Sequence, residues 1–136
     1  DEAGNEQNDI WSIDADGNVE SVVELPGQTI LRDVDGDRLI LGGTHEGQMN
    51  LYDHDRSTGE TTKLTDYDRA VMGGKLSPDG DKLVYATNES EDFDNVDVYV
   101  ADADGSNPRN LQIGETGAEA TPSDWHPDGD RILVSD

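Results

Sequence analysis

Apolar residues along this chain come in short packets that are separated by polar turns. The packets at residues 39–41, 83–85 and 132–134 each follow an Asp-Gly-Asp turn. These turns begin at residues 35, 79 and 128, so the pattern returns after 44 and then 49 residues. Asp-Gly supplies a positive φ at little steric cost and matches the twist of paired strands, so each turn predicts an antiparallel hairpin. No segment has the spacing of an amphipathic helix.

A second landmark returns with nearly the same step. Trp11, Tyr52 and Tyr99 each follow an aliphatic residue, and they stand 41 and 47 residues apart. Because they share one position of the repeat, we expect all three to pack between neighbouring repeats. Together the two landmarks predict twelve short strands, at residues 9–13, 19–25, 29–34, 38–42, 49–53, 60–64, 70–76, 82–87, 96–101, 109–113, 120–125 and 131–135.

Four short strands every 40–50 residues are typical of the blades of a β-propeller. The sequence therefore predicts an all-β chain with one domain over residues 1–136, built from blades of four antiparallel strands. One blade spans about residues 27–66 and a second about 69–113. The third is shared between the two halves of the chain, with residues 8–25 supplying its last two strands and residues 119–136 its first two.

Three blades are too few for a closed ring, because propellers have four to eight. Two chains would supply six blades, and the shared blade would form at both junctions of a two-fold symmetric homodimer. The alternative is that the chain is an excised piece of a longer propeller, whose open edges need the missing blades. The sequence leaves both interpretations open.

Acidic residues dominate the composition. The chain has 32 Asp and Glu against 9 Lys and Arg, and its formal net charge is −23. Because the acid is spread over all repeats, we interpret it as a halophilic adaptation; the alternative is an acidic patch for a basic partner. We expect the cell envelope or the extracellular space of a high-salt organism rather than the cytoplasm. No basic stripe suits nucleic acid, and no apolar run is long enough for membrane insertion.

Three segments carry a family resemblance. Residues 76–85, which read LSPDGDKLVY, and residues 98–107 are similar to the WD40-like PD40 repeat. Residues 125–132 show the same motif with His126 where Ser is usual, whereas residues 34–36 have lost the Ser-Pro part. This repeat is found in the propellers of TolB proteins and of prolyl-oligopeptidase-like (S9) peptidases.

The resemblance implies a non-enzymatic TolB-like module that acts as a protein-binding or assembly scaffold. Its partners would be a second copy of itself and another protein at the loop face of the ring. The alternative that the resemblance implies is the excised propeller of an S9 peptidase, which gates substrate access to a catalytic domain that is absent from these residues. No Gly-x-Ser-x-Gly elbow presents a nucleophile, so we expect that the chain has no catalytic residues and is not an enzyme.

Metal and cofactor sites are not expected. Asp-x-Asp-Gly occurs at residues 14–17, 33–36 and 102–105, but the Gly comes too early for a calcium loop, so these segments are predicted to be hairpin turns. The three histidines stand at unrelated repeat positions, and we expect them in polar loops or at edges. Surface carboxylates would bind Na⁺, K⁺ or Ca²⁺ only weakly.

The candidate ligand or partner site lies where an outer strand crosses to the next inner strand. Its residues are Tyr67, Arg69, Arg32, Glu119 and Thr121. Arg32 and Arg69 are cations near the expected axis of an acidic ring, so they predict either an anion site or salt bridges. We favour salt bridges.

Overall fold

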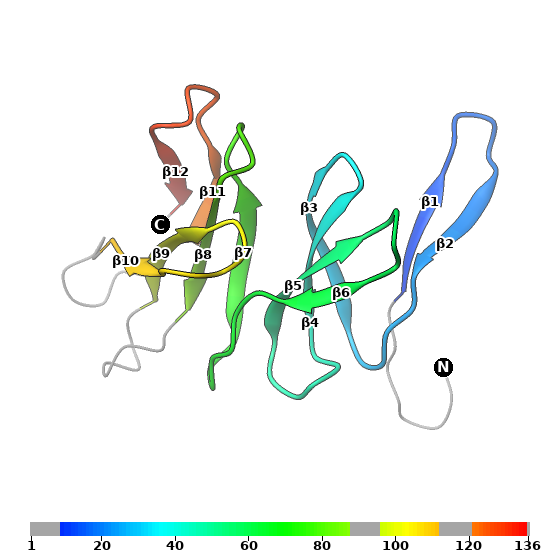
Figure 1. Cartoon of the computed structure of the whole chain (residues 1–136), viewed down its shortest axis with the longest axis horizontal. Helices are drawn as coiled ribbons and strands as arrows, with labels where there is room; N and C mark the ends of the chain where they lie inside the picture. The colour runs from blue at the N-terminus through cyan, green and yellow to red at the C-terminus, as the bar shows by residue number, and fades with distance from the viewer. Residues whose placement is uncertain (1–8, 88–95, 112–120, 136) are drawn as a thin grey trace.

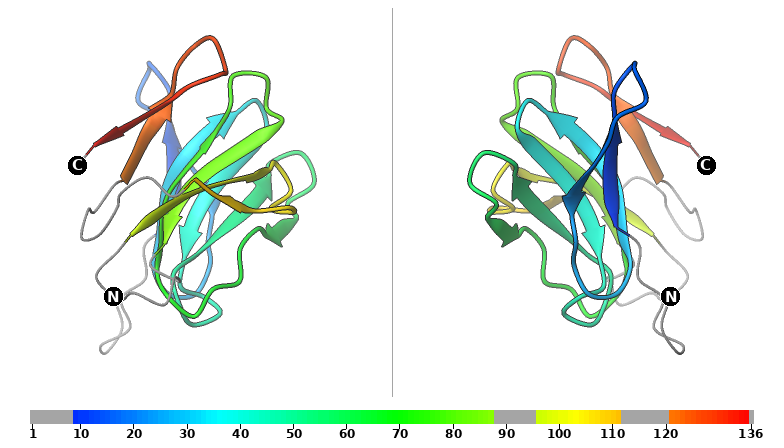
Figure 2. Two further views of the ribbon diagram at one scale, coloured as in Figure 1. Left: turned by 90° about the vertical axis from the view of Figure 1, so that its left-hand side faces the viewer. Right: turned by 90° about the vertical axis from the view of Figure 1, so that its right-hand side faces the viewer.

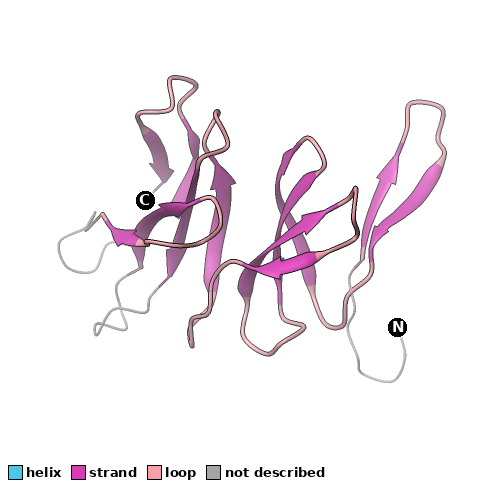
Figure 3. Cartoon of the chain, in the orientation of Figure 1, coloured by secondary structure: helices cyan, strands magenta, loops and turns pink. Residues whose placement is uncertain are grey.

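The computed structural model describes residues 9–87, 96–111 and 121–135, and every regular element in these residues is a β-strand (Figure 3). The all-β prediction is confirmed, and each predicted strand has its counterpart. The strands are β1 (Ile10–Ile13), β2 (Val19–Val23), β3 (Thr29–Asp35), β4 (Arg38–Gly43), β5 (Asn50–Asp55), β6 (Thr61–Lys63), β7 (Val71–Leu76), β8 (Lys82–Thr87), β9 (Asp97–Asp102), β10 (Arg109–Asn110), β11 (Thr121–Trp125) and β12 (Ile132–Ser135).

The strands form two complete sheets flanked by two hairpins. One sheet has the order β3-β4-β5-β6 and the other the order β7-β8-β9-β10, with antiparallel neighbours throughout. The hairpins are β1-β2 and β11-β12. The four units follow one another side by side in chain order (Figure 1), and the end-on views in Figure 2 show them stacked face to face. This is the arrangement of successive propeller blades.

The central strands of the first sheet, β4 and β5, are covered on both faces, and this explains why three consecutive residues of β4 are buried. Leu39 and Leu41 pack with Val23 toward the β1-β2 hairpin. Ile40 points the other way, because side chains alternate along a strand, and packs with Leu51 toward the second sheet. An unbroken apolar packet in the sequence is therefore a strand between two neighbouring sheets.

The second sheet repeats this division. Leu83 and Tyr85 face the first sheet and join its core. Val84 faces the other way and packs with Trp125 and Ile132 of the β11-β12 hairpin. Each unit thus hides its apolar faces on its neighbours, as expected of a repeat that cannot bury both faces alone.

Every inner strand is irregular at the same point. The register of β3 shifts between Leu31 and Asp33. The equivalent shifts lie between Gly73 and Lys75 in β7, and between Pro122 and Asp124 in β11. A bulge adds a residue to one strand and re-aims the side chains beside it. The three inner strands therefore present equivalent residues after their bulges.

Most of the large apolar side chains that remain exposed lie on the hairpins at the ends of this stack, and the others lie on β3. All of those among the described residues lie on β1, β2, β3 or β12, and they are Trp11, Ile13, Val19, Ile30, Leu31, Val34, Leu133 and Val134. The expectation that Trp11 packs between repeats is wrong for the single chain, because 57% of this residue is exposed. Tyr52 is buried and Tyr99 is packed against the core, as expected.

Candidate functional site

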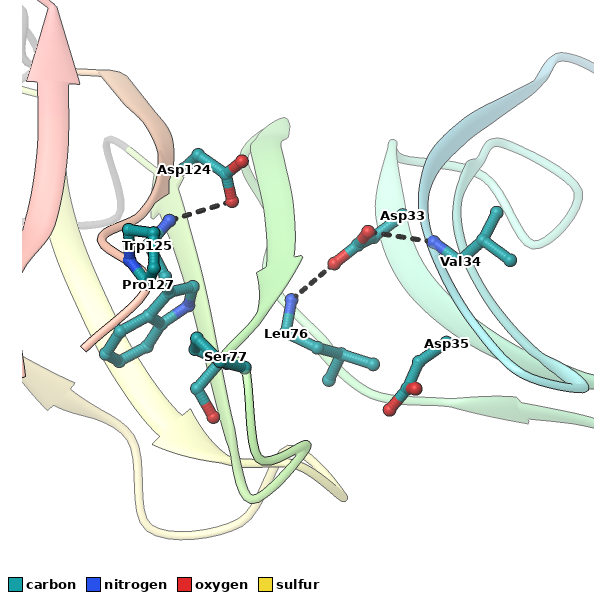
Figure 4. A pocket seen from close by; sticks show the side chains of 9 residues that line it. Asp33, Val34, Asp35, Leu76, Ser77, Asp124, Trp125 and Pro127 are labelled. Atoms are coloured by element: carbon teal, nitrogen blue, oxygen red, sulfur yellow. Dashed lines mark hydrogen bonds between the residues drawn. The ribbon is translucent and has the colours of Figure 1, made fainter. Parts of the chain in front are cut away.

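A cavity of about 370 Å³ lies where the ends of the three inner strands meet (Figure 4). Segments more than 40 residues apart in the sequence supply its walls, because the sheets stack side by side. It is lined by Asp33, Val34 and Asp35 at the end of β3, by Leu76, Ser77 and Pro78 at the end of β7 and just after it, and by Asp124, Trp125 and Pro127 at the end of β11 and just after it.

Asp33 ties two walls of the cavity together. Its Oδ1 accepts a hydrogen bond from the backbone N–H of Val34 at 2.8 Å, and its Oδ2 accepts one from the N–H of Leu76 in the next sheet, also at 2.8 Å. Asp124, at the equivalent place after its own bulge, accepts a hydrogen bond from the N–H of Trp125 at 2.8 Å. These carboxylates are thus placed by the inner-strand bulges.

Trp125 forms the aromatic wall of the cavity. Its Nε1 donates a hydrogen bond of 3.0 Å to the carbonyl oxygen of Lys75, which fixes the half-buried indole against the second sheet. A concave surface of carboxylates beside an indole favours a cationic group, through charge and through the face of the ring. Recognition of a basic side chain or an amine is therefore the chemistry that suits this surface.

The hydroxyl of Ser77 is engaged in the turn that closes the cavity. Its Oγ donates to Asp79 Oδ1 at 2.6 Å and accepts the backbone N–H of Lys82 at 3.0 Å. This leaves Ser77 in a structural role at the turn. His126 occupies the corresponding position after β11, where its Nδ1 lies 3.2 Å from the backbone nitrogen of Asp128. The substitution of His for Ser in the motif thus preserves a turn contact.

The turn carboxylates are held in their ionised form. Hydrogen bonds from the backbone N–H of Asp130 and from the Arg131 side chain lower the pKa of Asp128 to about 2. The Ser77 hydroxyl and the backbone N–H of Asp81 lower the pKa of Asp79 in the same way. Part of the acidic composition therefore has a local structural cause.

Tyr67, the first of the predicted ligand residues, lies between the two complete sheets. Its hydroxyl is 2.7 Å from that of Tyr85, and its ring contacts Tyr85 and Tyr99 at centroid distances of 5.9 and 6.1 Å. Its backbone N–H donates to Asn50 Oδ1 at 3.0 Å. This residue is thus built into the contact between the sheets.

Arg32 is half-buried at the bulge of β3, with its Cβ near Gly74 of the second sheet and its guanidinium over Gly42 of β4. Its Nε is buried and has no hydrogen-bond partner among the described residues, where Arg32 also forms no salt bridge. Burial lowers the pKa of its guanidinium. The salt bridge that we favoured for Arg32 is not seen in the described part of the chain.

Two of the remaining predicted site residues lie near the other ends of the inner strands. Arg69 is half-buried two residues before β7, and Thr121 begins β11. Glu119 lies outside the described residues. The structure thus divides the predicted set, with Tyr67 and Arg32 between the sheets and Arg69 and Thr121 at their crossover ends. It does not bring the set to the cavity.

The segments weighed as metal sites are turns or separate positions. Asp14 Oδ1 accepts the backbone N–H groups of Asp16 and Asn18, both at 2.9 Å, so this Asp-x-Asp-Gly segment closes a hairpin. His54 is buried on β5 with Nδ1 2.8 Å from Thr61 Oγ1, so the expectation of a loop or edge position is wrong for it. Across the described ranges, no three His, Asp or Glu side chains gather as a metal would require.

Sequence reasoning missed the cavity because it placed the site at the crossover ends of the inner strands. The signal was present in the repeat, where Asp33 stands two residues before its Asp-Gly turn, and Ser77 and Asp124 stand one and three residues before a Pro-Asp-Gly turn. Only the stacking of the sheets shows that these motif positions share one surface. Within the described residues there is also no helix of the length and apolar character that a membrane crossing needs.

No protein-family model matches the sequence. The chain is 30% identical over 134 residues to an uncharacterized protein of Agrobacterium fabrum, covering 91% of this chain and 45% of that protein. It is 32% identical over 103 residues to the oligogalacturonate lyase of Dickeya dadantii, covering 75% of this chain and 23% of the lyase. The chain thus spans less than half the length of these relatives.

Solved structures match over most of the chain. TolB from Acinetobacter baumannii superposes with a TM-score of 0.74 at 18% identity, over 93% of this chain and 31% of that one. A protein assigned as TolB from Agrobacterium tumefaciens gives 0.66 at 26% identity, over 93% and 49%. The tricorn protease gives 0.61 at 19% identity, over 79% and 10%.

These likenesses establish the class of protein, which is an all-β chain with the β-propeller fold. More narrowly, the fold is TolB-like, and the resemblance to the PD40 repeat is confirmed at the level of the fold. The matched proteins include two named as TolB, a lyase and a protease, so this one architecture carries different activities.

Proposed function

We propose that this chain is a non-enzymatic propeller module that binds proteins, and that two copies close a six-bladed ring. The observation that carries the proposal is the location of the exposed apolar residues. In the described residues, five of the eight lie on the end hairpins, on β1, β2 and β12, and the other three lie on β3, the inner strand of the first sheet. A second copy would cover both ends at once, and burial of apolar surface would drive the association.

The lengths of the relatives support a ring of this size. The chain covers 45% of the Agrobacterium fabrum protein and 49% of the TolB-like structure from Agrobacterium tumefaciens. Two copies would therefore match about the length of one such relative.

The partner surface that we propose is the acidic cavity at the ends of the inner strands. Asp33, Asp35 and Asp124 bring carboxylates to it, and Trp125 adds an aromatic wall. A partner that presents a lysine, an arginine or a free amine suits this combination. Arg69, Glu119 and Thr121 remain predicted contacts for a second partner face at the crossover ends.

The association is tested by measuring the molar mass of the chain in solution by light scattering, in molar KCl. One chain has a mass of 14.8 kDa, so the ring predicts a particle of twice that mass. Ile13→Asp, which places a charge on an exposed apolar position of β1, should shift the particle toward the single chain. Thr62→Asp on the exposed edge of β6 is the matched control and should leave the dimer intact.

A wild-type chain that stays at 14.8 kDa at every salt and protein concentration would contradict the ring. Such a result would favour the alternative interpretation, in which further sequence of a longer propeller covers the open edges. Equal loss of association in both variants would show that added charge, and not the proposed surface, is responsible.

A further inference from the structure

The two hairpins at the ends of the stack are complementary halves of one sheet. In both complete sheets the second strand pairs with the third, as β4 does with β5 and β8 with β9. The β11-β12 hairpin has the first and second strands, and the β1-β2 hairpin has the third and fourth. The open edge of β12, a second strand, thus lacks a third strand beside it. The strand that corresponds to this missing third strand is β1.

The complete sheets also give the register that such a junction would follow. Arg38 lies opposite Asp55 in the first sheet, and Lys82 lies opposite Asp102 in the second. The Lys82 Nζ and the Asp102 Oδ1 form an ion pair at 2.6 Å. Arg131 takes the place of Lys82 in β12, and Asp14 takes the place of Asp102 after β1. An Arg opposite an Asp would therefore mark the start of the new junction, although in the single chain the Arg131 side chain binds Asp128.

From this relationship we infer that β12 of one copy pairs antiparallel with β1 of a second copy in a single defined register. Arg131 lies opposite Asp14 of the second copy, Ile132 opposite its Ile13, Leu133 opposite its Ser12, and Val134 opposite its Trp11. The inference rests on the proposed function, because it assumes that the ring is closed by two copies of this chain.

The register explains the exposed side chains individually. Trp11 stands where Tyr99 stands in the second sheet, and Tyr99 stacks on Tyr85 with ring centroids 5.7 Å apart. In the composite sheet, Trp11 and Ile13 of the second copy share the face of Ile132, which packs on Val84 and Val98. Two of the most exposed apolar residues of the single chain thus reach a formed apolar surface.

The inner strand β3 also gains its missing neighbour. Leu31 lies opposite Leu41, and Val34 lies opposite Leu39, so both share the face that looks toward the β1-β2 hairpin. They remain 43% and 53% exposed in the single chain. Within the chain, the inner strand β3 lies beside the inner strand β7 of the next sheet. In the closed ring, β11 of the second copy lies beside β3 in the same way.

The hydrogen-bonding pattern of the complete sheets selects a pair for cross-linking. Arg56 N donates to Asp37 O, and Ala103 N donates to Asp81 O, which makes these directly opposed residues hydrogen-bonded pairs. Such pairs alternate with non-hydrogen-bonded pairs, whose Cα atoms are closer, at about 4.5 Å. Counting along the strands, Ile40–Asp53 and Val84–Val100 are non-hydrogen-bonded pairs. Leu133 and Ser12 of the second copy occupy the equivalent positions.

The experiment mixes two full-length single-cysteine variants, Ser12→Cys and Leu133→Cys, under mild oxidation in molar KCl. The chain has no cysteine of its own, so each thiol is unique. The register predicts a covalent dimer in the mixture and almost none from either variant alone, because equivalent residues lie far apart across the two-fold axis. Asp14→Cys with Leu133→Cys is the off-register control, since a diagonal separation of about 7 Å or more disfavours a disulfide.

Light scattering on the same samples separates failure of the register from failure of the ring. A dimeric mass with cross-linking of the in-register mixture at least fivefold above the control supports the inference. A dimeric mass with equal or greater cross-linking in the control overturns the register and leaves the ring standing. A monomeric mass with no cross-linking overturns both.

Discussion

Gly105, in the turn between β9 and β10, lies directly against the carbonyl group of Leu64 from the preceding sheet. A Cβ at this position would overlap the Leu64 carbonyl oxygen and would fall 2.9 Å from the carbonyl carbon. The turn of one sheet is thus seated on the backbone that leaves the previous sheet. This contact sets how closely neighbouring sheets approach at their outer strands.

Gly105→Ala is therefore expected to destabilise the fold well beyond the cost of its backbone conformation. Gly17 is the matched control, because it has the same φ of +87° and nothing within 4 Å of its Cβ position. Alanine at residue 17 should cost about 1–2 kcal/mol of unfolding free energy, from the left-handed backbone alone. Alanine at residue 105 should cost about 3 kcal/mol or more, since steric strain is added. Equal losses in denaturant unfolding would contradict the close contact.

The Tyr67 and Tyr85 hydroxyls form the polar contact inside the apolar boundary between the two sheets. Tyr67→Phe should cost about 1–3 kcal/mol, because it leaves the buried Tyr85 hydroxyl without its partner. The double variant Tyr67→Phe/Tyr85→Phe should lose less than the sum of the two single changes, since no orphaned hydroxyl remains. A strictly additive double-mutant cycle in chemical denaturation would show that the two groups are not coupled.

Asp128 predicts a defined response to acid. Its pKa is about 2 in the folded chain against an ordinary value of 3.8, so the folded state favours the ionised form. The stabilisation is complete above about pH 4 and is lost as the pH falls through about 2. In an NMR titration the Asp128 carboxyl should have its midpoint near 2, and Arg131→Ala should raise that midpoint. A wild-type midpoint near 3.8 would mean that the turn contacts are not formed.

The net charge of −23 predicts that stability rises with salt. The Debye length falls from about 10 Å at 0.1 M to about 3 Å at 1 M, so repulsion among surface carboxylates is screened. The melting temperature should rise between 0.1 and 2 M KCl. Replacing three exposed carboxylates in Glu20→Gln/Asp37→Asn/Glu60→Gln should reduce that slope. A wild-type melting temperature that does not change with KCl would refute the halophilic interpretation.

The strands could be predicted from the sequence because local chemistry decides them. Gly36, Gly80 and Gly129 adopt φ values of 59°, 78° and 77°, as the repeated Asp-Gly turns require. The apolar packets after these turns became strands buried between sheets wherever a neighbour exists on each side. Turn type and apolar spacing are properties of a few adjacent residues, so no long-range information was needed.

The position of Trp11 and the cavity could not be predicted in the same way. Tyr52 and Trp11 share one repeat position, but Tyr52 has a neighbouring sheet to cover it and Trp11 has none in this chain. The cavity depends on how the ends of β3, β7 and β11 converge, which is set by the stacking of sheets and by a bulge in each inner strand. Burial and convergence are properties of the assembly, and a repeat position alone does not specify them.

Closure of the ring is the central claim, and small-angle X-ray scattering of the wild-type chain in molar KCl tests it most directly. A closed dimer of two 136-residue chains should have a radius of gyration of about 19 Å, as expected for a compact particle of that size. A compact particle of about 14 Å would be a single chain. A dimer well above 19 Å would be an open, elongated association, and either of these last two results would contradict the account.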